Sequence, residues 1–292
     1  MSADSIEKKL YSAAKDGNTS EVSSLLRDHP LINVNWFEKA FLMTSLHISS
    51  YNDHVEVVKL LLVHPHIDVN LRDSTGKTPI SCGCEYGRVS VVKILLKHPR
   101  VDVTLEDNKG RTSLWYASCY GHNEVIEWLV ASGRDLGDVK NKKGGWWVHN
   151  KYFKYTSLDV AIKTGKNDEL VSLLKRFVAN PAQTRHELRV KLGMLDALAA
   201  EVFALIVFLC DDLFRLDFST NHLIGVLDTH NYFLLVRYMR KSCAFRFFSI
   251  SRRLPMELQM LLCHRVVGSM KQNILNKDSE LAFKSLANDL LS

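Results

Sequence analysis

Apolar and polar positions recur in the same order along the first 180 residues, with a period of 34. The pattern "TSLHISSYNDHVEVVKLLLVHPHIDVN" starts at Thr44, and closely similar stretches start at Thr78 and Thr112. Less regular copies start at Leu10 and Thr156. A fixed period of this length is typical of repeat proteins, in which each repeat buries its apolar side against its neighbours.

Each copy predicts two short helices joined by a tight turn. The first helix would start at the threonine, whose side chain can accept a hydrogen bond from a backbone N–H group at a helix start. The second helix supplies an apolar ridge such as Val57–Leu62. One slot between the helices favours a residue that tolerates a left-handed backbone, and it holds Asp53, Gly87, Gly121 and Gly165. An extended connector, turning at Gly76 or Gly110, leads to the next copy.

These anchors resemble the ankyrin repeat. The family's T-P-L-H-x-A-A-x-x-G-H-x-E-V-V-x-L-L-L pattern is matched from Thr44 through Leu62, and again at Thr78-Pro79-Ile80. The resemblance implies an all-α ankyrin-repeat solenoid of helix-turn-helix units with short hairpin fingers, and a non-catalytic protein that binds a protein partner. We predict a repeat domain over residues 1–181 whose outer units act as caps, with units near 5–35, 36–70, 71–104, 105–136 and 137–180.

Net charge, the length of the apolar runs and cysteine spacing argue against a duplex-binding, a membrane-spanning and a secreted protein. The formal net charge is +6, shared equally before and after Pro181, which does not favour a dedicated duplex-binding protein. The longest apolar run, residues 195–210, includes two acidic residues and is too short for a bilayer span. The chain shows no secretory signal and its six cysteines form no CxxC pair, so we expect a cytoplasmic or nuclear protein with reduced thiols.

No arrangement of residues predicts catalysis, a cofactor or a metal. The stretch "STGKTP" at 74–79 resembles the end of a phosphate-binding loop, but Leu71 stands where that motif needs a glycine. Cys82 and Cys84 occupy slots that hold small or apolar residues in other copies, and two cysteines alone make a poor zinc site. We therefore predict no catalytic residue, no cofactor and no metal ligand.

A partner surface is predicted on the concave side of the stack. The ankyrin resemblance implies that hairpin tips and the exposed side of the first helices bind partners. Two positions just before each inter-helix turn would contribute, and they hold Tyr51, Asn52, Glu85, Tyr86, Cys119 and Tyr120. Tyrosine suits an interface because it buries a large area with little loss of rotamer freedom. The alternative is that these tyrosines only pack one repeat on the next.

The stretch "NKKGGWWVHNKYFKY" at 141–155 breaks the period. Thr112 and Thr156 are 44 residues apart, and the ten extra residues enlarge one finger, residues 137–155. We expect its turn at Gly144-Gly145, with a partner site lined by Trp146, Trp147, Tyr152 and Phe153. The alternative is that these rings fold back onto the fifth unit or the C-terminal domain and only cover it. Lysines and rings interleaved in this way also suit single-stranded nucleic acid, although placement within the repeat makes this a minor interpretation.

After Pro181 the repeat stops, and residues 182–292 predict an all-helical domain. Arginines and lysines between 237 and 253 form a basic patch, either for an anionic ligand or as a solvated helix face. The stretch "LPMELQMLL" at 254–262 resembles the core of an F-box helix. That resemblance implies contacts to a ubiquitin-ligase scaffold by Leu254, Pro255, Leu258, Leu261 and Leu262.

The sequence as a whole favours a monomeric, non-catalytic scaffold for protein–protein interaction, without a transmembrane segment. Two alternatives stay open. The first is a substrate-recruiting adaptor of a ubiquitin ligase acting through residues 254–262. The second is a protein that binds an anionic ligand, phosphoinositide or nucleic acid, through residues 237–253, with nucleic acid the less favoured partner. The identity of the partner protein is not encoded in any motif.

Overall fold

The computed structural model describes residues 5–148, 151–165, 167–195, 215–217, 222–224, 256–266 and 274. The chain divides into two compact units, Met1–Leu188 and Arg189–Ser292. The sequence places the domain boundary at residue 181. Helix α11, Pro181–Lys191, begins there and continues across the division between the units.

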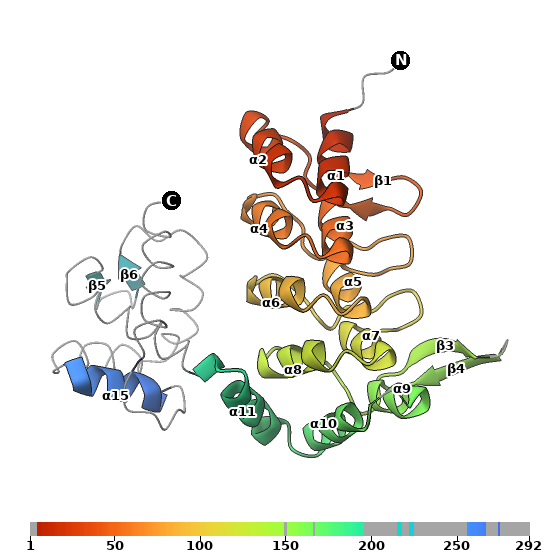
Figure 1. Ribbon diagram of the computed structural model, residues 1–292, viewed down its shortest axis with the longest axis vertical. Helices are drawn as coiled ribbons and strands as arrows, with labels where there is room; N and C mark the ends of the chain where they lie inside the picture. The colour runs from red at the N-terminus through yellow and green to blue at the C-terminus, as the bar shows by residue number, and fades with distance from the viewer. Residues whose placement is uncertain are drawn as a thin grey trace. The chain divides into compact units, whose positions relative to one another are not determined.

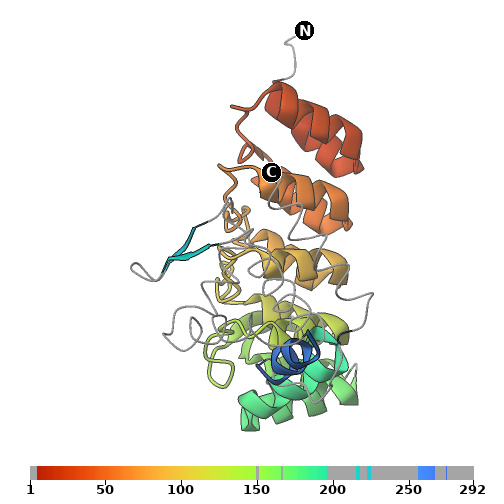
Figure 2. The same ribbon diagram turned by 90° about the vertical axis from the view of Figure 1, so that its left-hand side faces the viewer.

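Five helix pairs build the first unit, and they stack in two parallel rows (Figure 1). One row holds the first helix of each pair: α1 (Ile6–Asp16), α3 (Ser45–Asn52), α5 (Pro79–Glu85), α7 (Ser113–Tyr120) and α9 (Ser157–Thr164). The other row holds the second helix of each pair: α2 (Thr19–Asp28), α4 (Val55–Val63), α6 (Val89–Lys97), α8 (Asn123–Ala131) and α10 (Asp168–Ala179). Figure 2 shows the rise of the stack from its side. The all-α solenoid predicted from the sequence is confirmed.

The recurring threonines start the first helices as predicted. The side chains of Thr44, Thr78, Thr112 and Thr156 each accept a hydrogen bond from the backbone N–H group three residues later. These helices end near the predicted turn residues, and Asp53, Gly87, Gly121 and Gly165 all have positive φ angles. Local sequence therefore specifies both ends of the helices.

The core lies between the two helix rows. In the second helices it is formed by the predicted apolar ridge, and in three successive repeats the same slots are fully buried: Val58 and Leu61, Val92 and Leu95, Ile126 and Leu129. Cys82 and Cys84 are also buried, and burial raises the pKa of the Cys82 thiol to about 12. These thiols therefore act as small apolar side chains.

Polar side chains lock each repeat to its neighbour. At the start of the second helices, His54, Arg88 and His122 each hydrogen-bond a carbonyl oxygen at the end of the preceding repeat's first helix, at 2.9 Å. In the connectors, Asn70 Nδ2 donates to Arg100 O at 2.7 Å, and Asn70 Oδ1 accepts from the following connector's Asp102 N–H. The stack is therefore held by side chain–backbone bonds as well as by apolar contact.

The fingers are joined to one another by backbone hydrogen bonds. The first contains β1 (Phe37–Glu38) paired with β2 (Met43–Thr44), and the enlarged one contains β3 (Gly144–Val148) paired with β4 (Lys151–Tyr155). Successive bonds run from Ser74 N to Phe41 O, from Asn108 N to Thr75 O, and from Gly145 N to Lys109 O. We call this series the finger ladder.

The second unit is described only in part. It contains α15 (Met256–Val266) and a short antiparallel pair of β5 (Arg215–Asp217) and β6 (His222–Ile224). The strand pair differs from the all-helical prediction for residues 182–292, because so short an apolar run has no period that separates strand from helix. The basic patch at 237–253 lies outside the described residues. In the described part of the chain, no helix is long and apolar enough to cross a membrane.

Candidate protein-binding surface

Three tyrosines lie at or next to the ends of the first helices, one in each central repeat. The rings of Tyr51 and Tyr86 are 4.3 Å apart, and their hydroxyl groups interact. Partial burial and the hydrogen bond with Tyr51 raise the pKa of Tyr86. Tyr86 and Tyr120 remain exposed, with 43% of Tyr120 accessible. Tyr51 therefore packs one repeat on the next, whereas Tyr86 and Tyr120 present ring surface to solvent. Partner contacts by these tyrosines remain predictions.

The other residues predicted beside these tyrosines have partners within the chain. Cys119 is only 6% exposed, so the prediction that it contacts a partner is wrong: its side chain lies inside the repeat stack. Asn52 donates from its side-chain amide to Lys15 O at 3.0 Å, which ties α3 to the preceding repeat. The Glu85 carboxylate forms an ion pair with Lys77 Nζ at 2.8 Å. Partner contacts by Asn52 and Glu85 remain predictions.

A buried charged cluster, which sequence reasoning missed, anchors the third finger, residues 107–111. The Asp107 side chain is 1% exposed and accepts hydrogen bonds from Arg111 Nε and from Tyr116 Oη, both at 2.7 Å. Its other oxygen accepts from the N–H groups of Lys109 and Arg111. The guanidinium of Arg111 also lies 4.8 Å from the centre of the Tyr116 ring. The sequence signal that could have indicated this cluster is an aspartate four residues before an arginine, with a glycine turn between them.

These contacts give Asp107 a defined charge. Burial acts to raise the pKa of its carboxyl group, but the hydrogen bonds from Arg111 and Tyr116 outweigh burial and hold the pKa below its ordinary value of 3.8. Burial raises the pKa of the Tyr116 hydroxyl, and the hydrogen bond that this hydroxyl donates to Asp107 raises it further. Asp107 is therefore a carboxylate at neutral pH and holds the finger against α7.

The enlarged finger is a regular hairpin whose turn is not at Gly144-Gly145, so that prediction is wrong. Gly144 pairs with Tyr155, and Val148 pairs with Lys151. The glycines instead allow close packing at the base of the hairpin. A Cβ atom on Gly144 would lie 2.9 Å from Trp115 Nε1, and one on Gly145 would lie 1.8 Å from the hydroxyl of Tyr152. Turn propensity was overridden by tertiary contact.

The hairpin has two aromatic faces. On one face Trp147 pairs with Tyr152, ring centres 5.3 Å apart, and both are exposed, Trp147 by 58%. On the other face Trp146 is half-buried and packs edge-on against Tyr155, while its cross-strand partner Phe153 is exposed. The Trp115 indole N–H donates to Tyr155 O at 3.0 Å and fixes the base of the hairpin on α7. The base of the hairpin is therefore fixed on α7, and its outer part presents exposed rings; a partner site at these rings remains a prediction.

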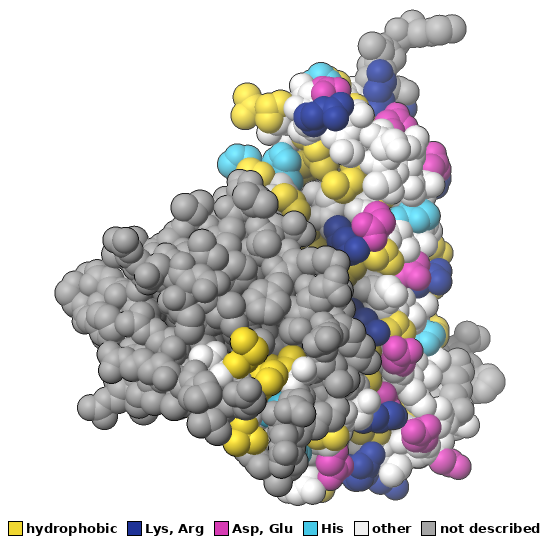
Figure 3. Space-filling view, turned by 60° about the vertical axis from the view of Figure 1, so that its left-hand side comes forward, with side chains coloured by type: hydrophobic (Ala, Val, Ile, Leu, Met, Phe, Trp, Pro, Cys, Tyr) yellow, Lys and Arg dark blue, Asp and Glu magenta, His cyan; other side chains and the backbone are white. Residues whose placement is uncertain are grey.

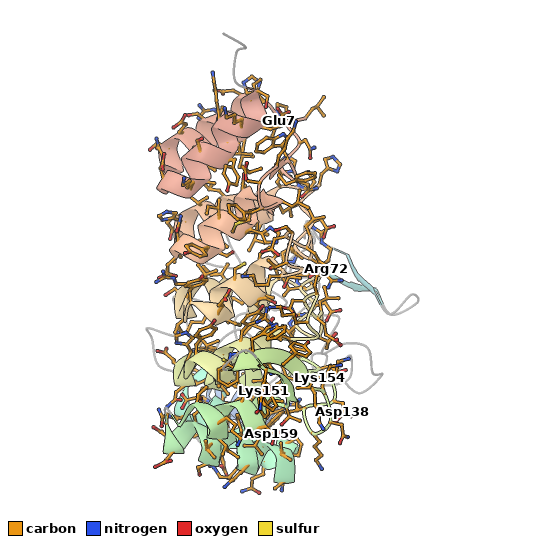
Figure 4. The ribbon with its side chains drawn as sticks, turned by 90° about the vertical axis from the view of Figure 1, so that its right-hand side faces the viewer. Glu7, Arg72, Asp138, Lys151, Lys154 and Asp159 are labelled. Atoms are coloured by element: carbon orange, nitrogen blue, oxygen red, sulfur yellow. The ribbon has the colours of Figure 1, made fainter. Side chains whose placement is uncertain are left out.

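The finger is also basic. Residues 137–155 contain five lysines and a single acidic residue, Asp138. Figure 4 shows Lys151, Lys154 and Asp138 together on the finger side of the stack, with Arg72 on an earlier finger. Over the rest of the first unit visible in Figure 3, acidic and basic side chains are interspersed. The excess of positive charge described here thus belongs to the enlarged finger.

The predicted adaptor segment is described only from Met256 onward. Leu254 and Pro255 lie outside the described residues, as does the side chain of Leu258. Leu261 and Leu262 are half-buried in α15, next to the buried Cys263 and His264. Within the described residues, no group of three or more His, Cys, Asp or Glu side chains could hold a metal ion.

Comparison with known proteins assigns the repeats. Residues 7–73 and 46–140 match the family described as ankyrin repeats (3 copies). The chain is 34% identical over 80 residues to E3 ubiquitin-protein ligase XBAT32 of Arabidopsis thaliana, which is 27% of this chain and 15% of the relative. It is 32% identical over 77 residues to Rabankyrin-5 of Mus musculus, which is 26% of this chain and 6% of the relative.

A third relative, probable E3 ubiquitin-protein ligase XBOS32 of Oryza sativa subsp. japonica, is 32% identical over 80 residues, 27% of this chain and 16% of its own length. The chain thus spans less than a fifth of each of these relatives. The family match and the stacked helix pairs with their threonine caps agree on the same architecture. Residues 7–140 of this chain therefore consist of ankyrin repeats.

Proposed function

We propose that this protein is a non-catalytic scaffold that binds a partner protein through the fingers and first helices of its ankyrin repeats. Ankyrin repeats indicate protein–protein interaction. The observation that carries the proposal is the set of large aromatic side chains left exposed on this side of the stack, among them Tyr86, Tyr120 and Trp147. Aromatic residues of this size dominate the energetics of protein interfaces.

The surface beneath these rings is preorganised. Lys77, at the base of a finger, forms a partly buried ion pair with Glu85, at the end of α5, and so ties that finger to the helix. The Asp107 cluster holds the next finger on α7. A rigid surface loses little conformational entropy on binding. The proposed partner therefore meets a fixed arrangement of rings.

The test is quantitative affinity capture from cell extract, with partners identified by mass spectrometry and confirmed with purified protein. The double variant Tyr120→Ala, Trp147→Ala should lose the partner at least about tenfold, because each ring is an expected anchor. The matched control is Leu31→Ala, Val63→Ala, which removes two side chains that are even more exposed and lie outside the fingers and first helices. Equal capture by both double variants would refute the proposed surface.

A second candidate is an adaptor that recruits substrates to a ubiquitin ligase. The observation in its favour is that two relatives bear the name E3 ubiquitin-protein ligase, although the similarity covers 80 residues in each. The candidate requires that Leu254, Pro255, Leu258, Leu261 and Leu262 bind a ligase scaffold. Co-purification of a ligase scaffold with the intact chain, abolished by Leu258→Asp in a variant that melts at the wild-type temperature, would support it. Binding that is unchanged in Leu258→Asp would dismiss it.

A further inference from the structure

The finger ladder ends at β4, and this end defines an interaction surface. In each step of the ladder, a finger donates a backbone N–H group to the finger before it, and the last step joins Gly145 N to Lys109 O at 2.8 Å. This bond places β3 on the side of the preceding finger. Strand β4 therefore faces away from the ladder, and α9 and α10 lead into α11 without a further finger. In Figure 1 the hairpin projects beyond α7 and α9.

The backbone of β4 has unused hydrogen-bonding groups on that outer edge. In an antiparallel pair, opposed residues alternate between pairs bonded to each other and pairs whose peptide groups point outward. Because Gly145 N–H points to Lys109, the pairs Gly145–Lys154 and Trp147–Tyr152 belong to the outward class. Within the described residues, the outward groups of Tyr152 and Lys154 accept and donate no hydrogen bond. An unpaired edge of this kind is a template for another strand.

The positive charge around the outer edge of β4 favours a partner strand with acidic side chains. Lys151 and Lys154 are exposed on β4 and form no ion pair within the described part of the chain. Lys143 on the approach to β3 is likewise exposed and forms no ion pair there. The Asp138 carboxylate is held by Asn141. A partner strand with acidic side chains would therefore meet uncompensated positive charge along its length.

We propose that an extended, acidic segment of a partner protein adds to the outer edge of β4 as a further strand. The inference rests on the proposed function and specifies its partner as a chain segment paired through the backbone of Tyr152 and Lys154. Strand addition gives affinity through main-chain bonds and selectivity through side chains. Peptide binding is favoured over single-stranded nucleic acid because Trp147 and Tyr152 pack on each other and so lose stacking surface for bases.

The test uses a short synthetic peptide of alternating glutamate and threonine, titrated against the full chain and followed by tryptophan fluorescence and amide hydrogen exchange. Binding should protect the amides of Tyr152 and Lys154 from exchange. The same peptide with N-methyl groups on alternate residues keeps its charge but loses strand pairing, and should bind at least about tenfold more weakly. A lysine–threonine peptide of equal length should not bind.

Two substitutions at one exposed position separate charge from backbone pairing. Lys154→Gln removes the charge and keeps the outward N–H, so peptide affinity should fall only about two- to fivefold. Lys154→Pro removes both, and proline is tolerated at an edge strand where the N–H faces solvent. Its affinity should fall a further three- to tenfold or more. Circular dichroism and the melting temperature establish that both variants fold.

Equal affinity for the methylated and unmethylated peptides, equal affinity of the Gln and Pro variants, or no binding of the acidic peptide would overturn the inference. So would tighter binding of a uridine oligonucleotide that depends on Trp147. In any of these cases, a partner protein still captured through Tyr120 and Trp147 would leave the proposed function standing. Loss of that capture, by contrast, would remove the function itself.

Discussion

Replacing Tyr116 with phenylalanine tests whether the buried charged cluster fixes the third finger, which holds Asp107 and Arg111. The Tyr116 side chain is fully buried, and its hydroxyl donates at 2.7 Å to the Asp107 carboxylate, which is itself almost inaccessible to water. The substitution keeps the ring and removes only the hydroxyl, so water has little room to replace the lost donor. A hydrogen bond to a charged group contributes about 1.5–3 kcal/mol. We expect the free energy of unfolding to fall by about 2 kcal/mol.

The measurement is urea unfolding followed by circular dichroism, with Tyr152→Phe as the matched control. Tyr152 is exposed and its hydroxyl lies over Gly145, so that control should change the free energy of unfolding by no more than about 0.5 kcal/mol. Equal denaturant slopes for wild type and variants are required, because an array of repeats can unfold in parts. A loss in Tyr116→Phe no larger than in Tyr152→Phe would refute the role of the cluster.

The same variant has a characteristic dependence on pH. The folded-state pKa of Asp107 lies below the ordinary value of 3.8, because the hydrogen bonds from Arg111 and Tyr116 outweigh burial. The stabilisation is therefore fully present above the unfolded-state pKa and is lost as the pH falls through the folded-state pKa. The difference between wild type and Tyr116→Phe should be constant from about pH 5 to 7 and shrink to about 1 kcal/mol in stronger acid. A difference that grows on acidification would contradict this assignment.

Two further substitutions test the packing of the finger and of the connector. Gly144→Ala places a methyl group 2.6 Å from Arg111 Cγ and 2.9 Å from the indole of buried Trp115. The substitution should therefore destabilise the protein by about 1–3 kcal/mol in thermal unfolding. An unchanged melting temperature would show that the hairpin base can shift. Arg134→Lys should lower the free energy of unfolding in urea by about 2 kcal/mol. The guanidinium donates to four backbone carbonyls of the preceding repeat, and a single amine cannot reach them all. A wild-type unfolding midpoint would contradict this role of Arg134.

The repeat was predictable because its signals are local. A threonine that caps its own helix and a residue with positive φ at the following turn need no knowledge of distant contacts, and Thr112 and Gly121 behave as the sequence indicates. The apolar ridge is equally local, since helical periodicity alone assigns its buried face. Helix starts, turns and core slots in the first unit therefore follow from the chain itself.

The surface was less predictable because its residues are fixed by side chains from other elements. Glu85 is positioned by Lys77, and Cys119 is enclosed by its neighbours, neither of which is visible in spacing. Gly144 and Gly145 have the composition of a turn, but they lie in β3, where Gly144 leaves space for the ring of Trp115 and Gly145 for the side chain of Tyr152. Interpretation from sequence fails where a residue's role depends on a side chain from another element.

The bond between Gly145 N and Lys109 O divides the enlarged finger into two regions with different tolerance to change. On the side toward the stack, the insertion leaves the register of the finger ladder unaltered. Beyond that bond, the chain can lengthen or change composition for little more than the slowly growing entropy of a longer loop. The outer hairpin is therefore a natural graft position, because foreign sequence placed there leaves the bond to the preceding finger unchanged.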